Sequence, residues 1–435
     1  MSEADDNSIS AVKARQLDAA RPDIVTRLHE RGRLTARERM ARLLDVDSEV
    51  EYGAIAARTT DGEWIAEAGG VDFVGAIDGN SVIASSTDYT DHGGGSGAGR
   101  LGRLYALALE HRWPVVLFVD GGGSRARHPR GGLGHIETSG TLGRFNALDG
   151  VIELSGWVPT ISIVSGPSFA GHASIAGFSD FLVATRGSAI GMGGPPMVEA
   201  ALGQRMTPQD LAGAEMHEGT GGIDLLVDDE PAAIAAARRY LGYYFGPSAR
   251  NEPEQPLPAT GGGYDMTDVI AGLVDADSFF ELRPQFAGNL ITGLARIDGK
   301  TVGLAANQPA VDDGCIDPGA ATKLARFIEI CNAYEYPIVS LIDTPGCTNT
   351  WLDRDGSSAR EGGIARWHLR PLKAHQARTV PLLAVQVARG HGLGAALMTG
   401  VSSTRGPALT VAWPGVEIGR RDGFSTLVDP NAVED

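Results

Sequence analysis

The sequence predicts an α/β protein built from two similar domains. Short apolar runs typical of buried strands alternate with amphipathic stretches typical of helices, which is the pattern of α/β folds. Three segments of the first half recur in the second half at a nearly constant spacing. A stretch rich in Pro, Gly and polar residues, 246–263, lies between the copies and indicates a domain boundary. We therefore expect one domain over residues 1–250 and a homologous one over residues 264–435.

The internal repeat rests on three pairs of matching segments. VGAIDGNSVIASS (74–86) matches LARIDGKTVGLAA (294–306), PVVLFVDGGG (114–123) matches PIVSLIDTPG (337–346), and PTISIVSGPSFAGHA (159–173) matches PLLAVQVARGHGLGA (381–395). The three offsets are 220, 223 and 222 residues. A period of this length is too long for a solenoid. It indicates duplication of a whole β/α domain.

The individual elements follow from local patterns. We expect helices over 101–113 and 232–245, buried strands over 114–120 and 159–166, and a hairpin within 71–85. The hairpin turns at Asp78-Gly79, a dipeptide that favours tight two-residue turns. Residues 11–45 are predicted to be helical, and a helix begins after Thr35, because Thr35 and Glu38 have capping-box spacing. Residues 1–10 are predicted to be disordered.

Composition and charge exclude several classes of protein. The formal net charge of −17 disfavours nucleic acid as a partner. No apolar run is long enough to span a membrane, and the acidic N-terminus is unlike a secretion signal. Three cysteines form no disulfide framework, and no spacing of ligand residues indicates a metal site. We expect a cytoplasmic protein without a bound metal.

Each half carries two loops that contain glycine and follow a predicted buried strand. They span 120–125 and 166–172 in the first half, and 343–346 and 390–394 in the second. Small residues let a ligand approach the backbone. A helix that starts after such a loop presents N–H groups without partners. Two N–H groups that converge on one oxygen form an oxyanion hole, so the loops predict stabilisation of a thioester enolate.

Several motifs resemble one family, in the right order along the chain. LHERGRLTARERMARLLD (28–45), DGGGSR (120–125), GPSFAG (166–171), ARIDGKTVGLAANQP (295–309), DTPG (343–346), EGGI (361–364) and WPGVEI (413–418) carry the likeness. They resemble motifs of the carboxyltransferase (beta) subunits of biotin-dependent acyl-CoA carboxylases, of the propionyl-CoA and acetyl-CoA carboxylase type. The resemblance implies a divergent member of that family whose C-terminal helical stretch is shortened.

The resemblance implies two tandem crotonase-like (ClpP/crotonase) domains that assemble into a hexamer. The first domain would bind an acyl-CoA, and the second would bind carboxybiotin supplied by a biotin carboxylase or biotin carrier partner, with no cofactor held covalently. Active sites would form where the first domain of one subunit faces the second domain of another. Carboxybiotin would release CO2, the biotin enolate would remove the α-proton, and the acyl enolate would capture the CO2.

The resemblance also assigns residues to the two sites. Gly122, Gly123, Ala170 and Gly171 would surround the acyl-CoA oxyanion hole, and Gly346, Leu393 and Gly394 would surround the hole for the ureido oxygen of biotin. Arg125 would anchor CoA phosphates, and Gly166 and Gly392 would let the ligands approach the backbone. No motif specifies the acyl group.

Departures from the family pattern leave two further functions open. Ala396 replaces an acidic residue of the family, Leu393 brings a bulky side chain to the biotin side, and 366–370 and 125–129 differ from their motifs. His172, beside the first oxyanion loop, is a candidate general acid or base. One alternative is therefore a biotin-independent acyl-CoA enolate enzyme, such as a decarboxylase, hydratase or other lyase. The other is a non-catalytic subunit of a carboxylase complex.

Overall fold

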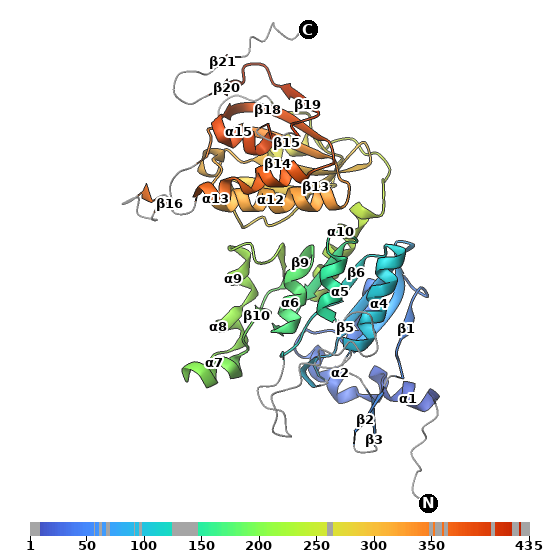
Figure 1. Ribbon diagram of the computed structural model, residues 1–435. Coiled ribbons are helices and arrows are strands. Elements are labelled where there is room, and N and C mark those ends of the chain that lie inside the picture. The colour runs from blue at the N-terminus through green and yellow to red at the C-terminus, as the bar shows by residue number, and fades with distance from the viewer. Residues whose placement is uncertain are drawn as a thin grey trace, which may run out of the picture. The chain divides into compact units, whose positions relative to one another are not determined.

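The computed structural model shows two compact units (Figure 1). It describes residues 9–55, 57–60, 63–66, 70–90, 92–94, 98–123, 147–258, 264–347, 351–352, 359–360, 364–401, 405–419 and 426–427. Internal contacts divide the chain into a first unit, Met1–Gly242, and a second unit, Tyr243–Asp435. The division precedes the linker 246–263 because linker residues pack on the second unit. Ser248 N–H donates to Gly299 O at 3.0 Å, and Arg296 donates to Gly246 O at 2.8 Å.

The first unit is built on a seven-stranded sheet. Its order is β1 (Val50–Tyr52), β4 (Gly70–Ile77), β5 (Asn80–Thr87), β6 (Val115–Phe118), β7 (Thr160–Val164), β9 (Phe181–Thr185) and β11 (Leu225–Val227). The pairs β1–β4 and β4–β5 are antiparallel, and the remaining neighbours are parallel. A small parallel pair, β8 (Pro167–Phe169) with β10 (Ala189–Gly191), and a hairpin, β2 (Ala57–Thr60) with β3 (Glu63–Ala66), complete the strands.

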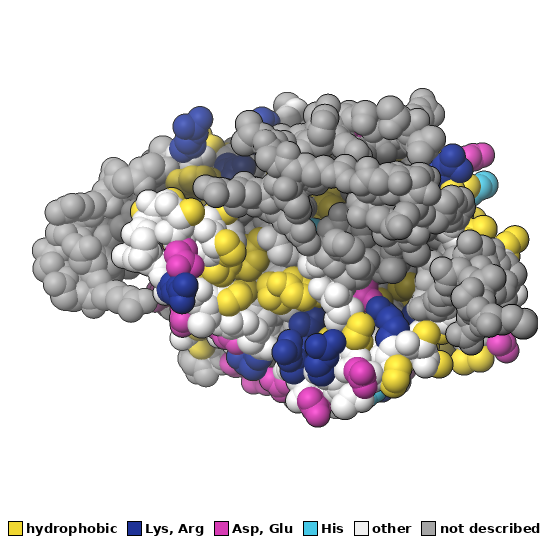
Figure 2. All heavy atoms as spheres, turned by 90° about the horizontal axis from the view of Figure 1, so that it is seen from below, with side chains coloured by type: hydrophobic (Ala, Val, Ile, Leu, Met, Phe, Trp, Pro, Cys, Tyr) yellow, Lys and Arg dark blue, Asp and Glu magenta, His cyan; other side chains and the backbone are white. Residues whose placement is uncertain are grey.

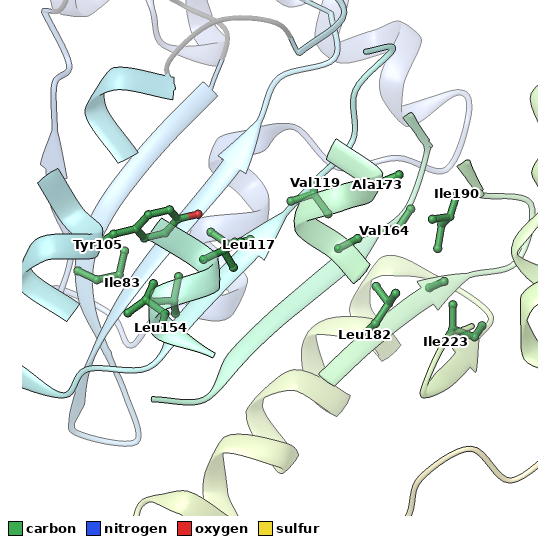
Figure 3. Packing of buried hydrophobic residues seen from close by; sticks show 14 of the residues in the cluster. Ile83, Tyr105, Leu117, Val119, Leu154, Val164, Ala173, Leu182, Ile190 and Ile223 are labelled. Carbon is green, nitrogen blue, oxygen red and sulfur yellow. The ribbon is translucent and has the colours of Figure 1, made fainter. Parts of the chain in front are cut away.

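Helices cover both faces of this sheet. The helices of this unit are α1 (Ile9–Arg15), α2 (Pro22–His29), α3 (Ala36–Leu43), α4 (Ala98–His111), α5 (Ala147–Leu154), α6 (Gly171–Phe178), α7 (Pro195–Leu202), α8 (Pro208–Ala212), α9 (Ala214–Glu218) and α10 (Glu230–Tyr244), and some of them cover the sheet. On one face, buried side chains of α4, α5 and α6 pack against the strands, with Tyr105 and Leu154 close to Leu117 (Figure 3). On the other face, the Phe181 and Tyr240 rings stack with centroids 4.6 Å apart, so α10 covers β9.

The N-terminal region contains several short helices in place of the continuous helical stretch predicted over 11–45. Pro22 begins α2, and Gly32, with a φ of 66°, lies in the turn before α3. The predicted capping box is present. Glu38 N–H donates to Thr35 Oγ1 at 3.1 Å, and Thr35 N–H donates to the Glu38 carboxylate at 2.8 Å.

The second unit repeats the same plan. Its sheet order is β12 (Phe280–Glu281), β13 (Leu290–Ile297), β14 (Lys300–Asn307), β15 (Ile338–Thr344), β18 (Leu382–His391), β20 (Glu417–Gly419) and β21 (Thr426–Leu427), with β19 (Leu409–Ala412) also paired to β18. The helices are α11 (Met266–Ala271), α12 (Pro318–Ala333), α13 (Ile364–His368), α14 (Arg370–Ala377) and α15 (Gly392–Thr399), and β16 (Trp351–Leu352) pairs with β17 (Ala359–Arg360).

Strand registers confirm that the two units share one topology. Ile83, Val115 and Thr160 lie side by side across β5, β6 and β7. Their counterparts at the three sequence offsets lie side by side across β14, β15 and β18, and these are Gly303, Ile338 and Leu382. The predicted α/β fold of two repeated units is therefore confirmed.

The repeat extends beyond the three segments that the sequence indicated. LLDVDS (43–48) matches LVDADS (273–278) in structure. The Asp45 carboxylate accepts hydrogen bonds from the N–H groups of the turn residues 78 and 79, and the Asp275 carboxylate does the same for 298 and 299. In both units a carboxylate therefore fixes the hairpin turn at one end of the sheet.

None of the helices that the structure describes is long and apolar enough to cross a membrane.

Candidate active site

In the first unit, the loop after β6 lies against the segment that leads into α6. Gly121 N–H donates to Pro167 O at 2.7 Å, and Phe169 N–H donates to Gly121 O at 2.8 Å. A Cβ added at Gly123 would lie only 2.9 Å from the Ala170 Cβ. Glycine is therefore required for this approach. The structure thus brings the two predicted glycine loops together at the N-terminus of α6.

Hydrogen bonding separates the four predicted oxyanion residues into two groups. Gly122 N–H donates to Gly93 O, and Ala170 N–H donates to Gly191 O, both at 3.0 Å. These two N–H groups are already used within the fold. Gly171 begins α6, where N–H groups have no acceptor within the helix. Within the described part of the chain, Gly123 N–H donates no hydrogen bond either. Of the four residues, Gly123 and Gly171 are therefore the two whose N–H groups have no backbone acceptor among the described residues.

Ala170, the residue before Gly171, has a strained backbone. Ala170 has φ 53° and ψ −118°, a conformation that residues with a Cβ rarely adopt. Holding an L-residue there costs about 1–3 kcal/mol, and such strain clusters at functional sites. The strained residue turns the chain sharply from β8 into α6. Gly171 follows directly, is exposed, and has no heavy atom within 4 Å of the Cβ position that it lacks.

His172 supports the loops from behind. Its Nε2 lies 3.1 Å from Gly94 O, and its ring occupies the space where a Cβ of Gly121 would lie, 2.2 Å away. Burial lowers the pKa of His172, and the carbonyl of Gly94 opposes this shift more weakly. The ring is therefore neutral near pH 7. Its buried Nδ1 has no hydrogen-bond partner among the described residues.

A buried ionic network holds the ends of β6 and β7. Asp120 Oδ1 accepts from the N–H groups of Ser165 and Gly166, at 3.0 and 2.8 Å. Asp120 Oδ2 accepts from Arg33 at 2.6 Å and from Arg39 at 2.7 Å. Burial alone would raise the pKa of Asp120, but the two arginines and the N–H groups hold it at about 2. Gly166 was predicted to contact a ligand, but its N–H group donates to this carboxylate.

The remaining member of the network is Glu230, which accepts from Arg39 at 2.6 Å and from Arg33 at 3.2 Å. Glu230 begins α10 and lies 191 residues from Arg39 in sequence. The network ties α3, the strand ends and α10 together directly behind the glycine loops. No local sequence pattern joins side chains so far apart, so the sequence does not predict this network.

The second unit places its predicted residues in the equivalent positions. A Cβ at Gly394 would lie 2.8 Å from Gly346 Cα, so the two loops touch as they do in the first unit. Gly392 has a φ of 55° and takes the place of Ala170. Leu393 lies in the first turn of α15, and its side chain is 41% exposed. Gly346 N–H donates to Thr344 Oγ1 at 3.2 Å, so this donor is partly committed.

Side chains behind the second pair of loops differ in character from those of the first unit. The repeat aligns β8–β10 with the ends of β18–β20, which sets His391 opposite Gly419 where Phe169 lies opposite Gly191. Phe169 belongs to an apolar cluster. His391 instead lies with its Nε2 3.7 Å from the Glu417 carboxylate, and neither ring nitrogen has a hydrogen-bond partner among the described residues.

The remaining candidates are Arg125, Cys347 and a metal site. Arg125, the predicted phosphate anchor, lies outside the described residues. Burial raises the pKa of Cys347 to about 12, with Cys315 adding to the shift, which disfavours a reactive thiolate. Within the described ranges, no group of three or more His, Cys, Asp or Glu side chains is arranged to hold a metal ion.

Comparison with known proteins assigns the family. The carboxyl transferase domain model matches residues 27–420, and the chain belongs to this family. The methylmalonyl-CoA carboxyltransferase 12S subunit of Propionibacterium freudenreichii subsp. shermanii is 32% identical, over 91% of this chain and 77% of that subunit. The methylmalonyl-CoA decarboxylase subunit alpha of Veillonella parvula is also 32% identical, over 91% of this chain and 79% of that subunit.

Solved structures agree with this assignment. A single-chain, multi-domain long-chain acyl-CoA carboxylase superposes with a TM-score of 0.83 and 33% identity, over 96% of this chain. This chain spans 44% of the length of that carboxylase. The transcarboxylase 12S hexamer, solved with methylmalonyl-CoA bound, superposes with a TM-score of 0.77 and 29% identity, over 95% of this chain and 82% of that one. The predicted family and the crotonase-like fold of both units are thus confirmed.

Proposed function

We propose that this chain is the carboxyltransferase component of an acyl-CoA carboxylase, and that it transfers CO2 from carboxybiotin to the α carbon of an acyl-CoA. The observation that carries the proposal is the N–H pair of Gly123 and Gly171, set on touching glycine loops and matched by a second pair of touching loops in the second unit. Membership of the carboxyl transferase family supports the same reaction.

The first unit is proposed to bind the thioester. Its carbonyl oxygen would accept hydrogen bonds from Gly123 and Gly171, and both would strengthen as negative charge develops on that oxygen. Each such donor typically contributes about 10²–10³ in rate. Loss of the α-proton gives the enolate, whose α carbon then forms the bond to CO2. The net charge is −17, and on the described part of the face in Figure 2 Lys and Arg side chains lie beside Asp and Glu side chains.

The second unit is proposed to bind biotin, which a partner protein carries and which supplies the CO2 and accepts the α-proton. A ureido oxygen is a neutral acceptor and suits N–H donors in the first turn of α15. Gly346 and Gly394 leave room for close approach, and the exposed side chain of Leu393 leaves its N–H accessible. Assembly as a hexamer is proposed by analogy with the 12S relative.

The substrate class is proposed from the names of the relatives, and the location is proposed from the cysteines. Relatives are named for methylmalonyl-CoA and propionyl-CoA, so we propose a short acyl-CoA as the substrate. Cys331 and Cys347 are free thiols, which suits the reducing cytoplasm.

One alternative, a biotin-independent decarboxylase, has observations of its own. The chain is as similar to a subunit named methylmalonyl-CoA decarboxylase as to the 12S carboxyltransferase. Neutral His172 lies beside the first pair of loops. A biotin-independent decarboxylase would release CO2 and protonate the same enolate. The role of a non-catalytic subunit would instead leave Gly123 and Gly171 without a ligand.

The deciding experiment measures CO2 release from methylmalonyl-CoA and malonyl-CoA by the purified chain, with and without biocytin. The proposal predicts release only when biocytin is present, because the carboxyl group must first pass to biotin. Release without biocytin would establish the biotin-independent enzyme. No release under either condition, with acyl-CoA binding absent by calorimetry, would indicate the non-catalytic subunit.

A further inference from the structure

The turn that follows β5 places a tyrosine hydroxyl beside the first pair of glycine loops. Tyr89 lies two residues after the end of β5, and its hydroxyl oxygen is 3.9 Å from the position that a Cβ of Gly122 would take. No other heavy atom of the described residues comes within 4 Å of that position, and Gly122 is exposed. Gly122 directly precedes Gly123, one of the two proposed donors. The Tyr89 hydroxyl therefore lies next to the proposed site of the thioester oxygen.

Hydrogen bonds of the residue before Tyr89 fix the backbone of this turn. The buried carboxylate of Asp88 accepts from Arg21 at 2.6 Å and from the N–H group of Thr90 at 2.9 Å. The side chain of Tyr89 is 42% exposed, and its hydroxyl has no hydrogen-bond partner among the described residues. A fixed turn thus presents a hydroxyl donor that can meet a ligand.

The second unit has no hydroxyl at the equivalent position. Gly94 and Gly314 correspond to each other, because both have a positive φ and an added Cβ would lie 2.6 or 2.5 Å from the carbonyl oxygen of the aspartate at the end of β6 or β15. The same offset of 220 residues sets Pro309 in the place of Tyr89. Proline has no side-chain donor. Touching glycine loops therefore occur in both units, whereas this hydroxyl distinguishes the first unit from the second.

The ligand proposed for the first unit offers one strong acceptor next to its thioester carbonyl. The carbonyl carbon is bonded to the sulfur, which is a weak acceptor, and to the α carbon, which carries a carboxylate once CO2 has been added. A hydroxyl forms a short, charge-assisted hydrogen bond with a carboxylate. We propose that Tyr89 is a specificity-determining residue whose hydroxyl donates to the α-carboxylate of the carboxylated acyl-CoA. This inference rests on the proposed function, in which the first unit holds the thioester.

The contact forms only when the α carbon carries a carboxylate. In the carboxylation step the enolate attacks CO2, the new carbon–carbon bond forms, and the negative charge moves from the enolate oxygen to the carboxylate. The N–H groups of Gly123 and Gly171 hold the charge before this step, and the Tyr89 hydroxyl meets it afterwards. Loss of the hydroxyl therefore lowers the affinity for the carboxylated acyl-CoA and leaves the affinity for the acyl-CoA without a carboxylate unchanged.

The test measures by calorimetry how the full chain, without biocytin, binds methylmalonyl-CoA and propionyl-CoA, which differ only in the α-carboxylate. Tyr89→Phe is expected to weaken binding of methylmalonyl-CoA about 10–100-fold, as loss of a hydrogen bond to a charged group does, and to change binding of propionyl-CoA less than about twofold. Tyr52→Phe is the matched control. The Tyr52 hydroxyl accepts from Arg103 at 3.1 Å on the edge strand β1, so both affinities should stay at their native values.

Two results would overturn this inference and leave the proposed function in place. Equal weakening of both ligands in Tyr89→Phe would place the hydroxyl on the thioester or on the CoA, and unchanged binding of both would show that it contacts neither. In each case Gly171→Pro should still weaken both ligands, because both contain the thioester oxygen. If the native chain binds neither acyl-CoA, the proposed function fails and the inference fails with it. Circular dichroism checks that every variant is folded.

Discussion

The two units share a backbone fold and differ in the side chains that pack around their paired loops. Both set a positive-φ residue before a helix, Ala170 in the first unit and Gly392 in the second, and both press two loops together there. The first unit supports its loops with a buried ionic network and an apolar cluster around Phe169. The second has His391 in the place of Phe169.

This difference indicates which part of the molecule carries the shared chemistry. Backbone N–H groups at a helix start can bind a carbonyl or ureido oxygen whatever the nearby side chains are. The geometry that presents them recurs in both units, whereas the surrounding side chains do not. Under the proposed function, the side chains therefore adapt each unit to its own ligand.

The largest difference is expected for the aspartates at the ends of β6 and β15. Asp120→Ala would remove one of the two carboxylates that pair with buried Arg39 and would leave the buried N–H groups of Ser165 and Gly166 without their acceptor, which costs about 3–5 kcal/mol of unfolding free energy. Asp343→Ala should cost less, about 1–2 kcal/mol, because its partner Arg389 is 27% exposed and can reach water. Denaturant unfolding of both variants measures the comparison. Equal costs would contradict the asymmetry between the units.

The same network predicts acid sensitivity. The folded pKa of Asp120 is about 2, below its ordinary value of 3.8, so this carboxylate stabilises the fold fully above about pH 4 and progressively less toward pH 2. The loss is about 2 kcal/mol for a shift of this size. Unfolding measured between about pH 5 and about pH 2.5 should show this loss in the native chain and a smaller one in Asp120→Asn. An equal loss in both chains would place the acid sensitivity elsewhere.

Removal of one backbone donor in each unit should affect activity about equally strongly. Proline is tolerated in the first turn of a helix but lacks the N–H. Gly171→Pro and Leu393→Pro are each expected to reduce biocytin-dependent CO2 release about 100-fold or more. Gly177→Ala, farther along α6 in open space, is the control and should keep full activity. Normal activity in a folded proline variant would exclude that donor.

The smallest effect concerns strain at the two equivalent turn residues. Ala170→Gly should stabilise the chain by up to about 1 kcal/mol, because relief of the positive φ outweighs the entropy cost of glycine. Gly392→Ala should destabilise it by about 1–2 kcal/mol. The added Cβ would meet no atom within 4 Å, but the backbone of the alanine would have to keep a φ of 55°. Thermal unfolding measures both changes, and opposite signs would show that packing dominates at these positions.

Sequence patterns predicted the architecture well where the repeat kept its residues similar. The strand pairs, the Asp78-Gly79 turn and the Thr35 capping box depend on local residue types. The repeat of 181–191 in 409–419 was missed, because Phe181 and Thr185 correspond to Leu409 and Trp413, and only the strand register reveals it.

The candidate site was predicted only as a neighbourhood. Glycine content indicated both loops, but it contains no information on which carbonyl each N–H meets. That Gly122 donates to Gly93 O, and Ala170 to Gly191 O, follows from tertiary contacts alone. The Arg33–Asp120–Glu230 network was invisible for the same reason, since its members come from three distant segments.

The central claim is that Gly123 and Gly171 hold the thioester oxygen in the first unit. Isotope-edited infrared difference spectroscopy of a bound acyl-CoA with a ¹³C-labelled thioester carbonyl tests this claim most directly. Two N–H donors should move the C=O stretch to lower frequency on binding, Gly171→Pro should remove most of that shift, and Leu393→Pro should leave it intact. A shift that persists in folded Gly171→Pro, or that disappears in Leu393→Pro, would contradict the assignment of the two units.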